Sequence, residues 1–148
     1  VYYRRRMGGA AMTILTSYHN STFDHTRREK IVAKVCKKLK KYPEEVGLVF
    51  TGLSGMLVGI PVAAKTKRPF AIVRKPHDSK HASFVVEGYK FKSFIIIDDF
   101  SESGGTIERI LAEMKTERGG KCKGIIMYDG NSCGSGRKSY NKIPIYNL

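Results

Sequence analysis

The sequence predicts a single α/β domain in which a mostly parallel sheet is flanked by helices. Short apolar stretches alternate with longer amphipathic ones from about residue 25 onward, and strands that alternate with helices form parallel sheets through right-handed crossovers. A length of 148 residues fits one domain with a buried core, and a hydrophobic content of 41% is that of a globular chain. No apolar run approaches the ~20 residues that a membrane span needs.

The first helix is predicted over residues 25–41, where apolar side chains recur every four residues. The recurring positions are Ile31, Val35 and Leu39. The spacing from Thr26 to Glu29 is that of a capping box at the helix start, and Pro43 ends the helix. The lysine-rich side of this helix is expected to face solvent.

Apolar runs then predict the strands, and apolar periodicity predicts two further helices. The strands are expected at 46–51, 70–73, 84–89, 94–98 and 124–128. One helix is expected at 56–65, where Pro61 kinks or shortens it, and the other at about 105–118, closed by Gly119.

The loops at 52–55, 74–83 and 98–106 each follow a predicted strand. Ligands in parallel sheets bind beyond the carboxyl ends of the strands. We therefore expect these three loops to converge on one crevice, with the polar 74–83 segment as a long mobile loop.

Charge and cysteine content narrow the classes of partner and compartment. The 27 Lys+Arg and 13 Asp+Glu residues give a net charge of +14, which favours a polyphosphate, a nucleic acid or an anionic surface without choosing among them. Three cysteines without metal-type spacing do not suggest a disulfide framework, so a cytoplasmic location is expected. Residues 1–11 are predicted to be a flexible basic leader and residues 12–148 the domain.

The most informative segment is residues 94–106, in which a buried strand ends in Asp98 and Asp99 and a small, hydroxyl-bearing loop opens the next helix. Backbone N–H groups at a helix start suit a phosphate, and carboxylates suit the hydroxyls of a sugar. The alternative is an ordinary strand-to-helix turn in which Asp99 or Ser103 serves only as a cap.

This segment resembles the 5-phosphoribosyl-1-pyrophosphate (PRPP) binding motif of type I phosphoribosyltransferases, and the similarity extends over about residues 46–128. The resemblance implies that family's fold, with a small variable hood from residues 12–24 or 129–148. It also implies transfer of the phosphoribosyl group of PRPP to a nucleobase, purine or orotate-like, with release of pyrophosphate and a nucleoside 5′-monophosphate. Family members are often homodimers, which makes a dimer the expectation here.

The resemblance assigns binding roles residue by residue. Asp98 and Asp99 would bind the ribose hydroxyls. The 5′-phosphate would be held by Glu102, Ser103, Gly104, Gly105 and Thr106. The pyrophosphate would be held by Leu53, Ser54, Gly55, Arg74 and Lys75. Mg²⁺ would arrive on the PRPP oxygens, and Asp98 and Asp99 are candidates for contacting it directly.

Three residues are candidates for the chemistry itself. Lys80 and His81 lie where orotate enzymes carry a closing loop, and they would neutralise the leaving pyrophosphate. The alternative for these two residues, and for Arg74 and Lys75, is a solvated hairpin loop whose cations have no binding role. Glu102 stands where the 6-oxopurine branch places a proton-exchanging aspartate. The alternative for Glu102 is an exposed carboxylate stabilised by the helix dipole.

The base is not assigned, because the closing loop resembles the orotate branch and Glu102 the 6-oxopurine branch. Tyr128 and Tyr140 are among the aromatic residues that could stack on it. A non-catalytic PRPP-sensing regulator that binds nucleic acid through the basic surface is the alternative function. A generic nucleic-acid binder is the third, although no RRM, KH or helix-turn-helix pattern is present.

Overall fold

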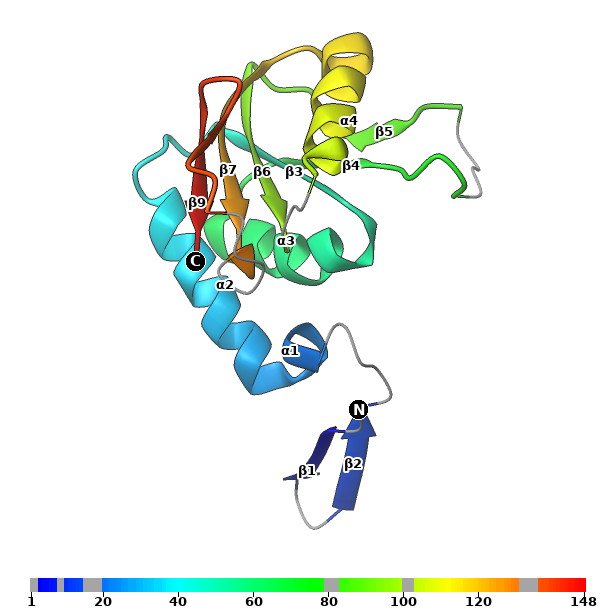
Figure 1. Ribbon diagram of the computed structural model, residues 1–148, viewed down its shortest axis with the longest axis vertical. Helices are drawn as coiled ribbons and strands as arrows, with labels where there is room; N and C mark the ends of the chain where they lie inside the picture. The colour runs from blue at the N-terminus through cyan, green and yellow to red at the C-terminus, as the bar shows by residue number, and fades with distance from the viewer. Residues whose placement is uncertain (1–2, 8–9, 15–19, 79–82, 100–102, 131–135) are drawn as a thin grey trace.

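The computed structural model describes residues 3–7, 10–14, 20–78, 83–99, 103–130 and 136–148. A seven-stranded sheet with the order β5-β4-β3-β6-β7-β9-β8 forms the centre of the molecule (Figure 1). The five inner strands are parallel, and β5 and β8 pair antiparallel at the two edges. The strands are β3 (Gly47–Thr51), β4 (Phe70–Val73), β5 (Val86–Gly88), β6 (Ser93–Asp98), β7 (Lys121–Met127), β8 (Ser139–Tyr140) and β9 (Ile143–Asn147). The predicted α/β fold with a mostly parallel sheet is confirmed.

Helices lie on both faces of this sheet. They are α1 (Asn20–Phe23), α2 (His25–Leu39), α3 (Gly52–Thr66) and α4 (Gly105–Glu113), which continues into the π-helical turn η1 (Met114–Arg118). A separate antiparallel hairpin joins β1 (Tyr3–Met7) to β2 (Ala10–Ile14), within and just after the segment predicted as a leader. The domain boundary at residue 11 stays a prediction.

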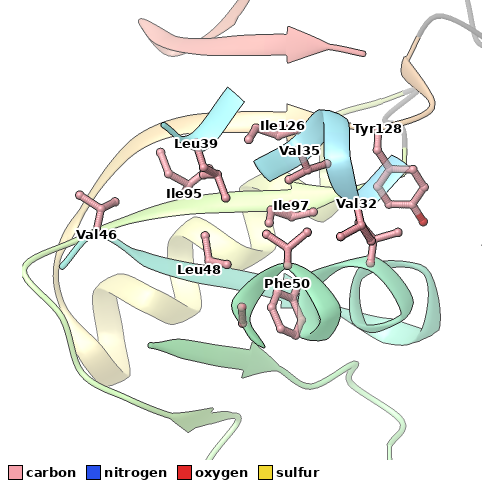
Figure 2. Packing of buried hydrophobic residues seen from close by; sticks show 13 residues of the cluster. Val32, Val35, Leu39, Val46, Leu48, Phe50, Ile95, Ile97, Ile126 and Tyr128 are labelled. Carbon is pink, nitrogen blue, oxygen red and sulfur yellow. The ribbon is translucent and has the colours of Figure 1, made fainter. Parts of the chain in front are cut away.

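The strands alternate their side chains between two hydrophobic layers, as a period of two requires. Leu48 and Phe50 of β3 pack with α2 and α3, in the layer that Figure 2 shows. Val49, between them in sequence, packs on the opposite face with Ile107 and Ile110 of α4. Both layers are fully buried at these positions, so the sheet is covered on both faces, as all-parallel strands need.

The structure corrects several predicted boundaries. The stretch 52–55, predicted as a loop, is the first turn of α3, because Gly52 at φ +61° lets the chain turn directly from strand into helix. Helix α3 continues across Pro61. The first helix ends at Leu39 rather than 41, and strand β5 covers only 86–88 of the predicted 84–89. Strands β8 and β9 were not predicted. No helix in the described ranges is long and apolar enough to cross a membrane.

The amino ends of β3 and β4 are held by a buried arginine. Arg68, which precedes β4, donates hydrogen bonds to the carbonyls of Leu39, Tyr42 and Val46 at 3.2, 2.7 and 3.0 Å, and also to that of Pro43. These carbonyls lie at the end of α2 and in the turn that follows it, where a helix leaves backbone oxygens without intrahelical partners. Arg68 therefore holds the amino ends of β3 and β4, at the end of the sheet opposite to the carboxyl ends of the strands.

Candidate active site

The carboxyl ends of three neighbouring strands, β4, β3 and β6, lie side by side because the strands are parallel. Thr51 and Val73 form the last paired positions of β3 and β4, and Asp98 is the last residue of β6. The predicted convergence of the segments after these strands is confirmed for the residues that the structure describes. Their binding roles stay predictions.

The acid pair at the end of β6 is buried, with Asp98 4% and Asp99 9% exposed. An oxygen of Asp98 accepts the backbone N–H of Asp99 at 3.0 Å and the hydroxyl of Ser54 at 3.4 Å. Burial first, and the neighbouring charge of Asp99 second, raise the pKa of Asp98 to about 7. The pair therefore carries a carboxyl group that changes its charge near neutral pH, and cations or hydroxyl donors would stabilise its ionised form.

The first turn of α3 faces this acid pair. Ser54 contacts Asp98 through its hydroxyl, and its carbonyl accepts the hydroxyl of Tyr128 at 2.9 Å. Thr51, the N-cap residue, does not cap the helix with its side chain, which leaves the first N–H groups of α3 open to an anion. Leu53 is about half exposed, whereas Gly55 is buried against Phe50, where a β-carbon would lie 2.9 Å from that of Phe50.

Arg74 and Lys75, which follow β4, are placed differently. A β-carbon at Gly52 would lie 2.6 Å from Cε of Lys75, so the lysine side chain lies over the first turn of α3. Arg74 instead forms an ion pair with Glu87 of β5 at 2.7 Å. Lys75 is thus positioned for an anion at α3, and Arg74 would have to share its guanidinium between Glu87 and a ligand.

The predicted phosphate loop leads into α4. Gly104 is the N-cap residue at φ +82°, and no side chain caps the helix there. The backbone N–H of Gly105 donates to the hydroxyl of Ser103 at 3.4 Å, and Thr106 is half-buried in the first turn. The N-terminus of α4 therefore offers backbone amides and the positive dipole end that suit a phosphate.

Several predicted residues lie outside the described ranges. Glu102, Lys80 and His81 are among them, so the structure places none of the three candidates for the chemistry. Of the aromatic candidates, Tyr128 is buried and bonded to Ser54, and Tyr140 lies against Gly104, 3.2 Å from the position of a β-carbon there. Among the described residues no cluster of three or more metal-ligating side chains is present.

Sequence reasoning missed two basic residues near these segments. Arg137 lines a small cavity with Gly104 and Tyr140, and its Nη1 atom lies 3.5 Å from the position of a β-carbon on Gly104. Arg109 of α4 donates to the carbonyl of Arg74 and to the hydroxyl of Thr51. Neither residue belongs to a recognisable motif, and in an amphipathic helix Arg109 reads as an ordinary solvent-facing position.

Comparison with solved structures confirms the fold. The chain superimposes on adenine phosphoribosyltransferase from Thermoanaerobacter pseudethanolicus with a TM-score of 0.63 and 19% identity, covering 95% of this chain and 88% of that one. It superimposes on orotate phosphoribosyltransferase from Mycobacterium tuberculosis with a TM-score of 0.62 and 13% identity, covering 99% and 86%. Both likenesses concern the fold.

Comparison with curated proteins adds sequence similarity, although no family model matches the chain. The chain is 32% identical over 110 residues to adenine phosphoribosyltransferase from Mycoplasmopsis agalactiae, covering 62% of each. It is 31% identical over 123 residues to orotate phosphoribosyltransferase from Picrophilus torridus, covering 73% of each. Together with the strand order and the acid pair beside α3, this similarity shows that the chain belongs to the type I phosphoribosyltransferase family.

Proposed function

We propose that the chain transfers the 5-phosphoribosyl group of PRPP to a nucleobase, releasing pyrophosphate and a nucleoside 5′-monophosphate. The observation that carries the proposal is the contact between Ser54 and Asp98, which joins the first turn of α3 to the acid pair of β6. It sets a prospective pyrophosphate site beside a prospective ribose site, as the two halves of PRPP require. The curated relatives named orotate and adenine phosphoribosyltransferase support the same chemistry.

The binding steps follow from the helix ends. The 5′-phosphate would sit at the N-terminus of α4, from Ser103 to Thr106, and the ribose hydroxyls would face Asp98 and Asp99. The pyrophosphate would lie on the turn of Leu53, Ser54 and Gly55, with Lys75 above it and Arg74 near by. Each group of PRPP would then meet a protein group of complementary charge or hydrogen-bonding capacity.

The reaction exchanges one bond for another at the anomeric carbon. The bond from this carbon to the pyrophosphate oxygen breaks with both electrons leaving on pyrophosphate, and a ring nitrogen of the base supplies the new pair. Positive charge develops on the ribose in the transition state, and the buried carboxylates of Asp98 and Asp99 would stabilise it. Lys80 and His81 would neutralise the departing pyrophosphate, and Glu102 would accept the proton that the base loses.

The donor set also fits Mg²⁺ delivered by the substrate. The described residues supply carboxylate oxygens at Asp98 and Asp99 but no larger cluster of ligands, and Mg²⁺ is commonly held by one or two carboxylates together with substrate phosphates. Bound in this way, the ion would offset negative charge on the pyrophosphate. The proposal therefore includes dependence on Mg²⁺.

The first test is turnover across a panel of bases containing orotate, adenine, guanine, hypoxanthine, xanthine and uracil, with PRPP and Mg²⁺. We expect pyrophosphate release with at least one base, and thermal stabilisation by PRPP with Mg²⁺. Thermal stabilisation by PRPP without turnover of any base would mean that the protein is a PRPP sensor and not an enzyme. Absence of both stabilisation and turnover would exclude PRPP as the ligand. Nothing in the described part of the chain favours the nucleic-acid-binding regulator.

Glu102 is tested separately because the structure does not place it. If it exchanges a proton with the base, Glu102→Gln should lower kcat by about 10²-fold or more while leaving the affinity for PRPP nearly unchanged. An unchanged kcat would mean that Glu102 has no part in the chemistry and is an exposed carboxylate stabilised by the helix dipole. The proposal further includes a homodimer, to be checked by light scattering, and a reducing compartment such as the cytoplasm, in keeping with the free thiols of Cys36 and Cys122.

A further inference from the structure

We propose that Arg109 is a positioning residue that holds the two pyrophosphate-binding segments at a fixed separation. The inference rests on the proposed function for its ligand, but the contacts that carry it belong to the ligand-free structure. The guanidinium Nη1 donates to the carbonyl oxygen of Arg74 at 2.7 Å, and Nη2 donates to the hydroxyl oxygen of Thr51 at 2.9 Å. One planar group thus spans the ends of β3 and β4.

The network continues across the gap between these strands. The hydroxyl of Thr51, which accepts from Arg109, itself donates to the carbonyl of Val73 at 2.5 Å. Val73 is the register partner of Thr51 and the last residue of β4. The chain of donors therefore closes a loop from Arg109 through Thr51 and β4 back to the Arg74 carbonyl.

The fixed atoms are those on which the pyrophosphate segments depend. Thr51 is the N-cap residue of α3, so its position sets the first turn, Gly52 to Gly55. The Arg74 carbonyl is the last atom group before Lys75, whose side chain lies over Gly52. A shift of the end of β3 or of β4 would separate Lys75 from the start of α3. Arg109 resists this shift because its guanidinium is bonded to both strand ends.

Arg109 reaches these two segments from α4, the helix that begins at the third segment. Arg109 lies one helical turn beyond Gly105, the first residue of the helix at the predicted 5′-phosphate loop. Among the described residues Arg109 makes no ion pair. No described carboxylate pairs with its charge, which adds positive potential near a site proposed for a polyanion. Lysine could not replace it fully, because a single ammonium lacks the planar fork.

The experiment compares Arg109→Met and Arg109→Lys with two controls. Lys115→Met removes an exposed cation from the same helical stretch, and Arg68→Lys alters a buried arginine at the opposite edge of the sheet. Hydrogen exchange in the ligand-free protein is the first readout. We expect Arg109→Met to speed exchange at least about tenfold at the amides of residues 55, 56 and 74, with Arg109→Lys intermediate and both controls unchanged there. The amides of 55 and 56 are the first that are bonded within α3, and the amide of Arg74 donates to the carbonyl of Val85.

Ligand affinity is the second readout. Arg109→Met should weaken PRPP and pyrophosphate about 10- to 100-fold while leaving ribose 5-phosphate within about threefold, because the phosphate loop does not depend on this clamp. Equal weakening of all three ligands, or unchanged exchange at residues 55, 56 and 74, would overturn the inference. If the wild-type protein binds none of these ligands, the proposed function fails, and the exchange measurement alone decides the role of Arg109.

Discussion

Replacing Asp98 by asparagine should stabilise the ligand-free protein at alkaline pH and weaken its proposed substrate site. Burial and the charge of Asp99 raise the pKa of Asp98 from 3.8 to about 7, and a rise of about 3 units corresponds to about 4 kcal/mol at about 1.36 kcal/mol per unit. Asparagine removes this buried charge. It also keeps an oxygen that can accept from the Asp99 N–H and the Ser54 hydroxyl.

The sign of the pH effect follows from the direction of the pKa shift. Between about pH 4 and pH 7 the folded protein holds a proton on Asp98 that the unfolded chain has lost, so the free energy of unfolding of the wild type falls as the pH rises through this window. The asparagine variant lacks this loss. Its stability relative to the wild type should therefore grow by about 2–4 kcal/mol from pH 4 to pH 8, or roughly 5–15 °C in Tm.

The assay is denaturant unfolding of both proteins across this pH range, with Glu45→Gln as a control that neutralises an exposed carboxylate outside the site. The control should show no comparable pH-dependent gain. A constant difference between Asp98→Asn and the wild type at every pH would refute the reasoning, because the burial of a charged Asp98 would then cost nothing. The same variant should bind PRPP more weakly, as expected where a functional site is held at a cost in stability.

Two further substitutions test the site, and a third tests a contact between η1 and β5. Ser54→Ala removes the hydroxyl that Asp98 accepts at 3.4 Å and should lower PRPP affinity about 3- to 10-fold by calorimetry. Gly104→Ala places a β-carbon on a residue at φ +82° and close to Tyr140, so it should weaken ribose 5-phosphate binding and lower the unfolding free energy by about 1–2 kcal/mol. Glu117→Ala removes the carboxylate that accepts the backbone N–H groups of Val85 and Val86 at 3.0 and 2.7 Å. It should lower the free energy of unfolding by about 1–3 kcal/mol, and Glu117→Gln should recover part of this loss.

Each of these three expectations has an outcome that would contradict it. An unchanged PRPP affinity for Ser54→Ala would mean that the contact with Asp98 has no part in binding. Ribose 5-phosphate binding that survives Gly104→Ala would move the phosphate away from the start of α4. Equal stability of Glu117→Ala and the wild type would show that water replaces the carboxylate at the β5 amides without loss.

The elements with local signals were predicted well. Strand β6 follows directly from its apolar run and terminal acids, and α2 follows from Ile31, Val35 and Leu39 at a spacing of four. Where a whole strand was missed, as with β9, the deciding contact was distant in sequence. Strand β9 exists because it pairs with β7. Its residues 143–146 are apolar, but Pro144 within them argues against a strand, and the segment is only half-buried.

The site divides in the same way. Asp98, Asp99 and the glycine-containing start of α4 could be found from sequence, because adjacent residues at a strand end and a helix start form a local pattern. Arg109 could not be found, because its acceptors at Thr51 and Arg74 lie on other elements. Nor could the pairing of Arg74 with Glu87, which depends on the antiparallel register of β4 and β5.

By itself, then, the sequence determined the alternation of strands and helices and the chemical type of the groups at the strand ends. Both are written in short stretches of chain, where periodicity and neighbouring residues act directly. Only the tertiary structure decided that Asp98 meets Ser54 in a buried setting, where desolvation and the charge of Asp99 raise its pKa, and that Arg109 joins β3 to β4. These outcomes depend on strand order, register and burial, which bring together side chains that no local pattern connects.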